Sequence, residues 1–121
     1  MASFYKSLAG EGETFTVSTA RLDEVLDGVP DLIKIDVEGA ELSAIEGMQK
    51  LLGAASPPKL IIEHNPTSCA AAGYRPGDIF NKLVSFQPAY RVYWIGWRLK
   101  QIKSADELNS ISRQGNLLVH V

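Results

Sequence analysis

Residues 31–39 read Asp-Leu-Ile-Lys-Ile-Asp-Val-Glu-Gly, and this stretch decides the fold. An extended segment alternates its side chains between two faces, and here both faces carry apolar groups. A short apolar run of this kind is typical of a central strand in a parallel sheet, covered on both sides. The pattern predicts a strand from Asp31 to Val37, followed by a turn at Glu38 and Gly39. Its apolar residues are Leu32, Ile33, Ile35 and Val37.

Helical and extended patterns alternate on both sides of this strand. Before it, the alternation of β-branched residues over 14–18 predicts a short strand, and the pattern over 19–26 predicts a short helix. In the helix that follows the strand, Glu41 is expected to face water. After the strand, the patterns predict helices at 40–52, at 77–86 and from Ser104, strands at 59–63, 90–95, 99–102 and 116–121, and a loop with a helical turn at 67–74. Such alternation implies an α/β fold, with a three-layer, mostly parallel sheet of about five strands and helices on both faces.

Composition indicates one globular domain over residues 1–121. Hydrophobic residues make up 45% and charged residues 21%, and the net charge is −2, so no nucleic acid or anionic membrane is expected as a partner. The chain has one cysteine, Cys69, which excludes an intrachain disulfide and fits a reducing compartment. No apolar run resembles a signal core or a membrane span, so a cytoplasmic location is expected.

Polar side chains follow two of the predicted buried strands. Asp36, Glu38 and Gly39 end the first strand, and Glu63 and His64 end the second. Ligands of open parallel sheets bind outside the carboxyl ends of the strands. If these two strands are neighbours, their polar groups converge on one rim of the sheet, which makes them the candidate site.

Each candidate has a structural alternative. Asp36 can pair with Lys34, which points to the same face of the strand, instead of facing a ligand. Glu38 can be stabilised by the dipole of the helix that follows it. Glu63 and His64 can act as acid and base or as two metal ligands, but a lone pair of this kind is a weak signal.

The twelve residues from Asp31 to Leu42 resemble the signature of FkbM-family methyltransferases, whose strand reads Lys-Ile-Asp-Val-Glu-Gly-Ala-Glu. Weaker similarities lie in the family's order before this match, at 16–26, and after it, at 60–63, 90–93 and 116–119. The resemblance implies a truncated Rossmann-like methyltransferase fold, in which the last strand is antiparallel between two others. It also implies S-adenosylmethionine as the cofactor of an O-methyltransferase.

The same resemblance implies roles for the candidate residues. Asp36, Glu38 and Gly39 are expected near the cofactor, and Asp36 and Glu38 also face the substrate. Glu63 or His64 is expected to orient the acceptor hydroxyl, so that the catalytic set is Asp36, Glu38, Glu63 and His64. This interpretation assigns no metal-binding residue.

The sequence departs from the family where the cofactor is held. Family members carry a glycine-rich loop after a first buried strand, whereas Gly10-Glu11-Gly12 has no apolar strand before it. The chain is therefore expected to lack the amino-terminal cofactor-binding half and to be inactive alone, unless a partner chain supplies that loop. Two other functions stay open: a non-catalytic binding or assembly module that dimerises, and a small metal-dependent enzyme that uses Asp36, Glu38, Glu63 and His64.

The strand from Leu32 to Val37 is central in the whole fold and would be an exposed edge here. Unpaired apolar edges invite pairing with another chain. We expect a second copy or a partner chain to cover this edge, or the strand at 14–18 to do so through a right-handed crossover.

Overall fold

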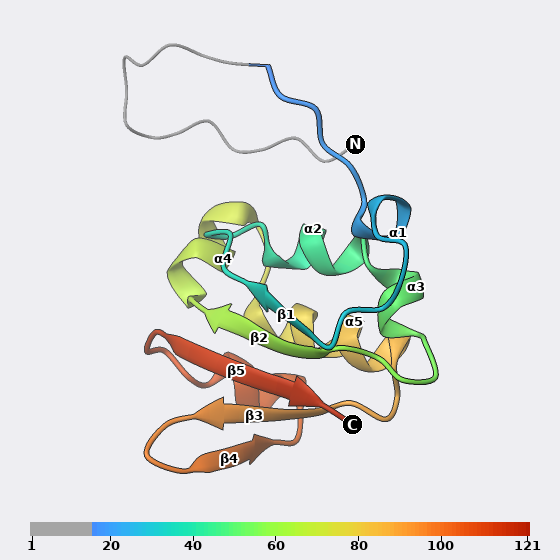
Figure 1. Ribbon diagram of the computed structural model, residues 1–121. Coiled ribbons are helices and arrows are strands. Elements are labelled where there is room, and N and C mark those ends of the chain that lie inside the picture. Colours follow the sequence, from blue (N-terminus) through green and yellow to red (C-terminus); the bar gives the residue numbers. More distant parts are fainter. Residues whose placement is uncertain (1–15) are drawn as a thin grey trace.

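The computed structural model describes residues 16–121. Within them the strands form one five-stranded sheet with the order β1-β2-β5-β3-β4 (Figure 1). The strands are β1 (Leu32–Ile35), β2 (Lys59–His64), β3 (Arg91–Ile95), β4 (Leu99–Ile102) and β5 (Gly115–His120). The helices are α1 (Leu22–Val25), α2 (Glu41–Glu46), α3 (Gln49–Leu52), α4 (Pro66–Ala72), α5 (Pro76–Phe86) and α6 (Ala105–Asn109).

The sheet is mixed, and the prediction of a mostly parallel sheet was wrong. Only β1 and β2 pair in parallel, while the pairs β2–β5, β5–β3 and β3–β4 are antiparallel. The expected antiparallel direction of the last strand is confirmed, because β5 lies between β2 and β3. β2 and β3 run in the same direction. Because β5 lies between them and runs the opposite way, each of them forms an antiparallel pair with β5 and not a parallel pair with the other.

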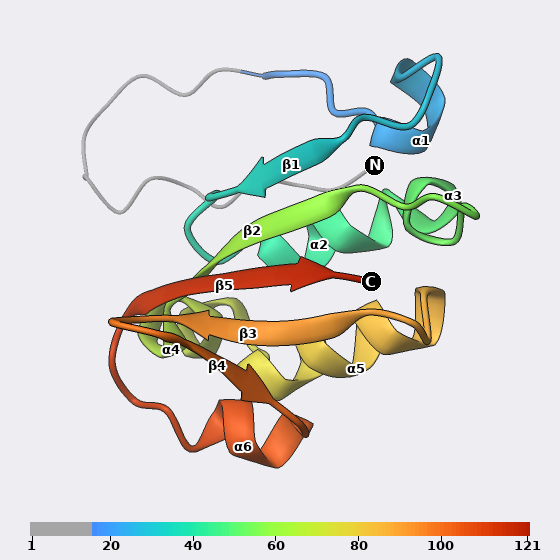
Figure 2. The same cartoon turned by 60° about the horizontal axis from the view of Figure 1, so that its bottom comes forward.

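Helices cover one face of the sheet in the described residues, so the predicted third layer is wrong for this part of the chain. Figure 2 looks onto the sheet and shows α2, α4 and α5 behind it. The strands β1, β2 and β3 run in one direction and follow each other across the sheet, so right-handed crossovers place their connecting helices on the same side. On the other face Ile61, Leu118 and Tyr93 are neighbours in register and are only partly buried.

Several element bounds differ from the predictions. The strand predicted over 31–37 is shorter, because β1 ends at Ile35. Of the strand predicted over 14–18, residues 16–18 do not form a strand, and Thr14 and Phe15 lie outside the described residues. The helix expected over 40–52 is broken at Gly47 into α2 and α3. The Asp23 carboxylate accepts hydrogen bonds from the amides of Lys50 and Leu51, at 2.8 and 3.0 Å, and so caps the second of these helices.

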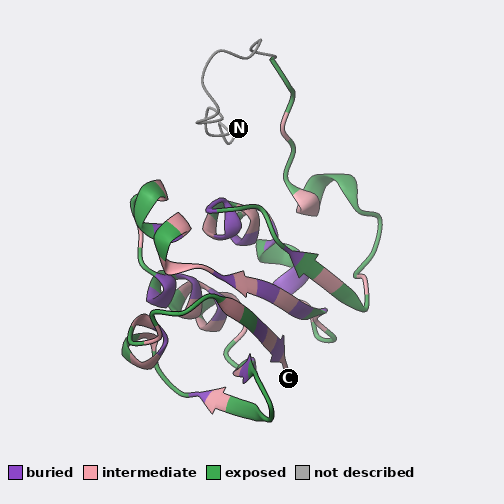
Figure 3. Ribbon diagram, turned by 90° about the vertical axis from the view of Figure 1, so that its left-hand side faces the viewer, coloured by how far each residue is buried: buried purple, intermediate pink, exposed green. Residues whose placement is uncertain are grey.

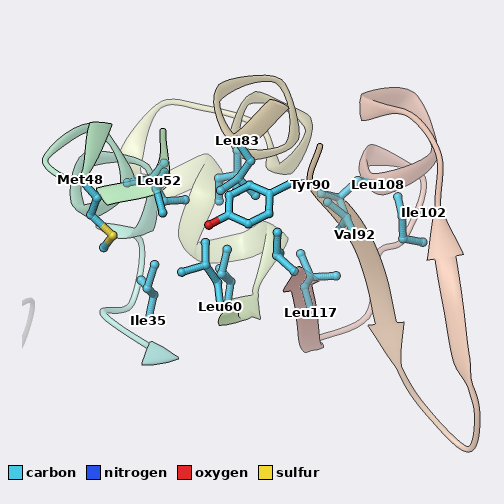
Figure 4. Packing of buried hydrophobic residues seen from close by; sticks show 14 of the residues in the cluster. Ile35, Met48, Leu52, Leu60, Leu83, Tyr90, Val92, Ile102, Leu108 and Leu117 are labelled. Carbon is cyan, nitrogen blue, oxygen red and sulfur yellow. The ribbon is translucent and has the colours of Figure 1, made fainter. Parts of the chain in front are cut away.

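The hydrophobic core fills the space between the helices and the covered face of the sheet. Leu52 and Leu83 from the helices pack over Leu60 and Leu117 from the sheet (Figure 4). Figure 3 shows the same layer as purple segments along the strands and the inner sides of the helices. Within residues 16–121, no helix is both long enough and apolar enough to cross a bilayer.

Tyr90 is buried in the core and is hydrogen-bonded to Pro58, the residue before β2, so it should affect the stability of the protein at alkaline pH. Its side chain is 2% exposed, its hydroxyl donates a 2.7 Å hydrogen bond to the Pro58 carbonyl, and burial raises its pKa from 10 to about 12. Because the unfolded chain loses this proton first, the stabilisation is complete below pH 10 and is lost as the pH rises from 10 to 12. We expect this loss to reach roughly 3 kcal/mol.

Tyr90→Phe should remove this part of the pH dependence and should cost about 1 kcal/mol at neutral pH, because the Pro58 carbonyl loses its partner. Urea unfolding of both proteins from pH 8 to 12 checks the expectation. Tyr93→Phe, which changes a partly buried tyrosine on the open face, is the control. Parallel pH profiles for wild type and Tyr90→Phe would contradict it.

Candidate functional site

Two acidic side chains meet at the carboxyl ends of the parallel pair. Ile35 of β1 is in register with Ile62 of β2, so the next residues, Asp36 and Glu63, are neighbours. Alternation directs both toward the face that the helices leave open, because Ile35 and Ile62 are buried in the core. The side chains therefore lie at the edge of the sheet where ligands of such folds bind.

A third carboxylate, Glu41 at the start of α2, joins them. One oxygen from each of Asp36, Glu41 and Glu63 lies within 4.8 Å of the other two. We call these three residues the carboxylate cluster. Asp36 is exposed and Glu63 is half-buried, but the Glu41 side chain is only 2% exposed, so the prediction that it faces water was wrong.

The turn between β1 and α2 directs Glu41 inward. Glu38 and Gly39 both have positive φ angles, of 44° and 97°. The Gly39 amide donates a 2.8 Å hydrogen bond to Glu41 Oε2. The Tyr74 hydroxyl lies 2.9 Å from the Gly39 carbonyl and 3.4 Å from the same Glu41 oxygen. One oxygen of Glu41 is thus held in place, while Oε1 is buried and has no hydrogen-bond partner among the residues that the structure describes.

Gly39 itself is packed against the protein. A Cβ atom at this position would lie 3.0 Å from the Ser68 carbonyl oxygen in α4 and 3.6 Å from the Ala72 side chain. The space that a side chain would need at Gly39 is therefore filled by α4. Glu38 is exposed on the outside of the same turn.

Glu63 is held by an amide and by its acidic neighbours. Gln114, from the segment before β5, donates a hydrogen bond to Glu63 Oε1. The pKa of Glu63 is raised, mainly by its hydrogen bond with the Asp36 carboxyl, and further by burial and by the charges of Asp36 and Glu41. The hydrogen bond from Gln114 opposes this shift. The site therefore gathers three acidic side chains, and the neighbouring carboxylates disfavour ionisation of Glu63.

His64 lies apart from the cluster. It follows Glu63 in an extended strand, so its ring points to the covered face, where it is 2% exposed. Its Nε2 donates a 2.8 Å hydrogen bond to the Ile111 carbonyl, and the ring packs edge-on against Trp94 with 5.3 Å between centroids. Burial lowers the pKa of His64. The structure thus brings Asp36 and Glu63 together and leaves His64 in the core.

Among residues 16–121, no Gly-x-Gly loop of the kind that holds the nucleotide part of S-adenosylmethionine follows a strand. Such a cofactor needs backbone that a ligand can approach closely, usually at glycines after a buried strand. Gly39, the glycine that follows β1, contacts α4. The carboxylate cluster, in contrast, offers oxygen ligands for a hydroxyl group or a cation.

Comparisons with known proteins found a matching family and a similar crystal structure. The model of the Methyltransferase FkbM domain matches residues 2–92, which include the whole carboxylate cluster. The crystal structure of methyltransferase FkbM from Methylobacillus flagellatus KT is similar, with 25% sequence identity and a TM-score of 0.53 over 83% of this chain. The chain spans 22% of the length of that protein. No curated protein matches it.

Proposed function

This chain belongs to the FkbM methyltransferase family, and from that premise we propose that it forms the acceptor side of an S-adenosylmethionine-dependent O-methyltransferase. The cofactor is held by a separate polypeptide segment that docks on β1. One observation carries the proposal: the strand that bears the acidic rim has no second neighbour among residues 16–121.

The rim carboxylates give this chain its part in the reaction. Asp36 and Glu63 lie at the open face and accept hydrogen bonds from a hydroxyl group of the acceptor. Holding that oxygen in a fixed position lowers the entropic cost of reaching the transferred methyl group. Glu41 and the turn at Gly39 fix the position of the rim relative to β1. The isolated chain orients the acceptor and does not transfer the methyl group.

The edge of β1 supports docking of a cofactor-binding half. Leu32 is 53% exposed and Val37 is 43% exposed, although both belong to an apolar stretch. A strand with unpaired backbone groups and exposed apolar side chains is a template for another strand. A parallel partner strand would place its own carboxyl end beside Asp36, where a cofactor loop has to lie.

Calorimetric titration with S-adenosylmethionine tests this function. We expect no saturable binding to the chain alone. We expect one-to-one binding after addition of a polypeptide that comprises the glycine-rich half of an FkbM methyltransferase. Tight binding to the lone chain, or no binding to the mixture, would refute the proposal. A cytoplasmic location is proposed with it, supported by the buried, unpaired thiol of Cys69.

The exposed edge also favours a second function, a non-catalytic assembly module in which two copies pair through β1. Leu32→Lys should then convert the dimer to a monomer, because a charge on an edge strand opposes pairing. Val121→Lys, which changes another exposed apolar residue, is the control. Light scattering after gel filtration distinguishes the two masses. A wild-type monomer would exclude this function and leave the first one untouched.

A further inference from the structure

We propose that the carboxylate cluster of Asp36, Glu41 and Glu63 binds one hard divalent cation, Mg²⁺ or Ca²⁺. The inference goes beyond methyl transfer and does not depend on it, because the three ligands belong to this chain. It rests on two independent observations, the spacing of the oxygens and the state of Glu41.

The spacing fits a single ion. Mg²⁺ and Ca²⁺ bind oxygen at about 2.0 to 2.6 Å, so two ligands on opposite sides of one ion are roughly 4 to 5 Å apart. The three carboxylate oxygens of the cluster all lie within 4.8 Å of one another. One ion can therefore contact all three without movement of β1, β2 or α2, and water can fill its remaining positions on the open face.

Glu41 provides the second observation. Its side chain is only 2% exposed, and Oε1 has no hydrogen-bond partner within residues 16–121. A buried carboxylate oxygen without a partner is costly, and native proteins rarely keep one without a reason. The other oxygen is held by the Gly39 amide and approached by the Tyr74 hydroxyl, so the carboxylate has a fixed position beside Asp36 and Glu63. A cation bound by the Glu41 carboxylate would give Oε1 the partner that residues 16–121 do not supply.

The chemistry of the ligand set selects the class of ion. The cluster consists of carboxylate oxygens alone, which hard cations prefer. The nearby imidazole of His64 is in the core, bonded to the Ile111 carbonyl, and is not directed at the cluster. Gln114, in the segment before β5, donates a hydrogen bond to Glu63 of the cluster. Its amide is neutral and does not offset the charge of the carboxylates. The site therefore suits Mg²⁺ or Ca²⁺ and not a metal that requires nitrogen or sulfur ligands.

Calorimetry with chelator-treated protein tests the site, with CaCl₂ and MgCl₂ titrated separately in the absence of S-adenosylmethionine. We expect saturable one-to-one binding of at least one of the two ions. Glu41→Gln should weaken it by at least about tenfold. Glu46→Gln, a change of an exposed carboxylate in the same helix, should leave it unchanged. The thermal midpoint of the wild type should rise with ion concentration, as linkage requires.

A surface variant keeps the test decisive if Glu41→Gln folds poorly. Asp36 is exposed, so Asp36→Asn should preserve the circular dichroism spectrum while it weakens binding to a similar extent. Absence of binding to the wild type at millimolar Ca²⁺ and Mg²⁺ would overturn the inference. Binding that is equal in wild type, Asp36→Asn and Glu41→Gln would overturn it as well. Because no cofactor is used, neither result bears on methyl transfer.

Discussion

Leu83→Ala should lower the free energy of unfolding by about 3 kcal/mol. Leu83 is fully buried in α5, where it packs over the sheet between Leu52 and Tyr90 (Figure 4). Truncation to alanine removes apolar contacts and leaves a cavity, because helix and sheet relax only partly around it. Small domains have only about 5 to 15 kcal/mol of stability, so the variant should lose a large share of it.

Urea unfolding followed by circular dichroism measures this loss. Asn81→Ala, which changes an exposed residue of the same helix, is the matched control and should lie within about 0.5 kcal/mol of the wild type. A loss below about 1 kcal/mol in Leu83→Ala would mean that α5 does not pack on the sheet as described, since core truncations of leucine normally cost 2 kcal/mol or more.

Gly39→Val should destabilise the chain by about 3 kcal/mol and disrupt the carboxylate cluster. The φ angle of 97° is one that a β-branched residue rarely adopts. The new Cβ would also meet the Ser68 carbonyl at 3.0 Å. Relief of this contact requires the turn to move away from α4, which breaks the hydrogen bond between the Gly39 amide and Glu41.

Gly28→Val is the control, because a Cβ at Gly28 would have no atom within 4 Å. We expect its stability to stay within about 0.5 kcal/mol of the wild type. Amide chemical shifts of Gly39 or its replacement and of Glu41 report the local change in the same samples. Equal stabilities of the two variants would show that the turn is not constrained by α4.

Local patterns were enough to predict most elements. The apolar run after Pro58 predicted β2, and the Ser104 capping box predicted α6, whose Ser104 side chain accepts from the Glu107 amide at 3.1 Å. The position of β5 between β2 and β3 was expected only from the family resemblance, because it depends on pairings far apart in the sequence that local patterns do not reveal. The number of parallel strand pairs could not be predicted from the periodicity of the apolar residues alone.

The candidate site was predicted in part. Asp36 and Glu63 were identified because they end apolar strands, and the structure brings them together. Glu41 was missed because its charge suggested a solvent-facing position, whereas its partners are the turn before it and Tyr74, more than thirty residues later. Its place in the family motif, two residues after Gly39, was the available signal. Strict alternation along β2 would also have separated His64 from Glu63.

The central claim is that β1 is an open edge that the other half of the methyltransferase fold completes. Amide hydrogen exchange, measured by NMR on the chain alone and with the glycine-rich half of an FkbM methyltransferase, tests it most directly. The account predicts that residues 32–37 exchange faster than residues 59–64 in the isolated chain and become protected when the second polypeptide is added. Equal protection of both strands in the isolated monomer, or no change on addition, would contradict it.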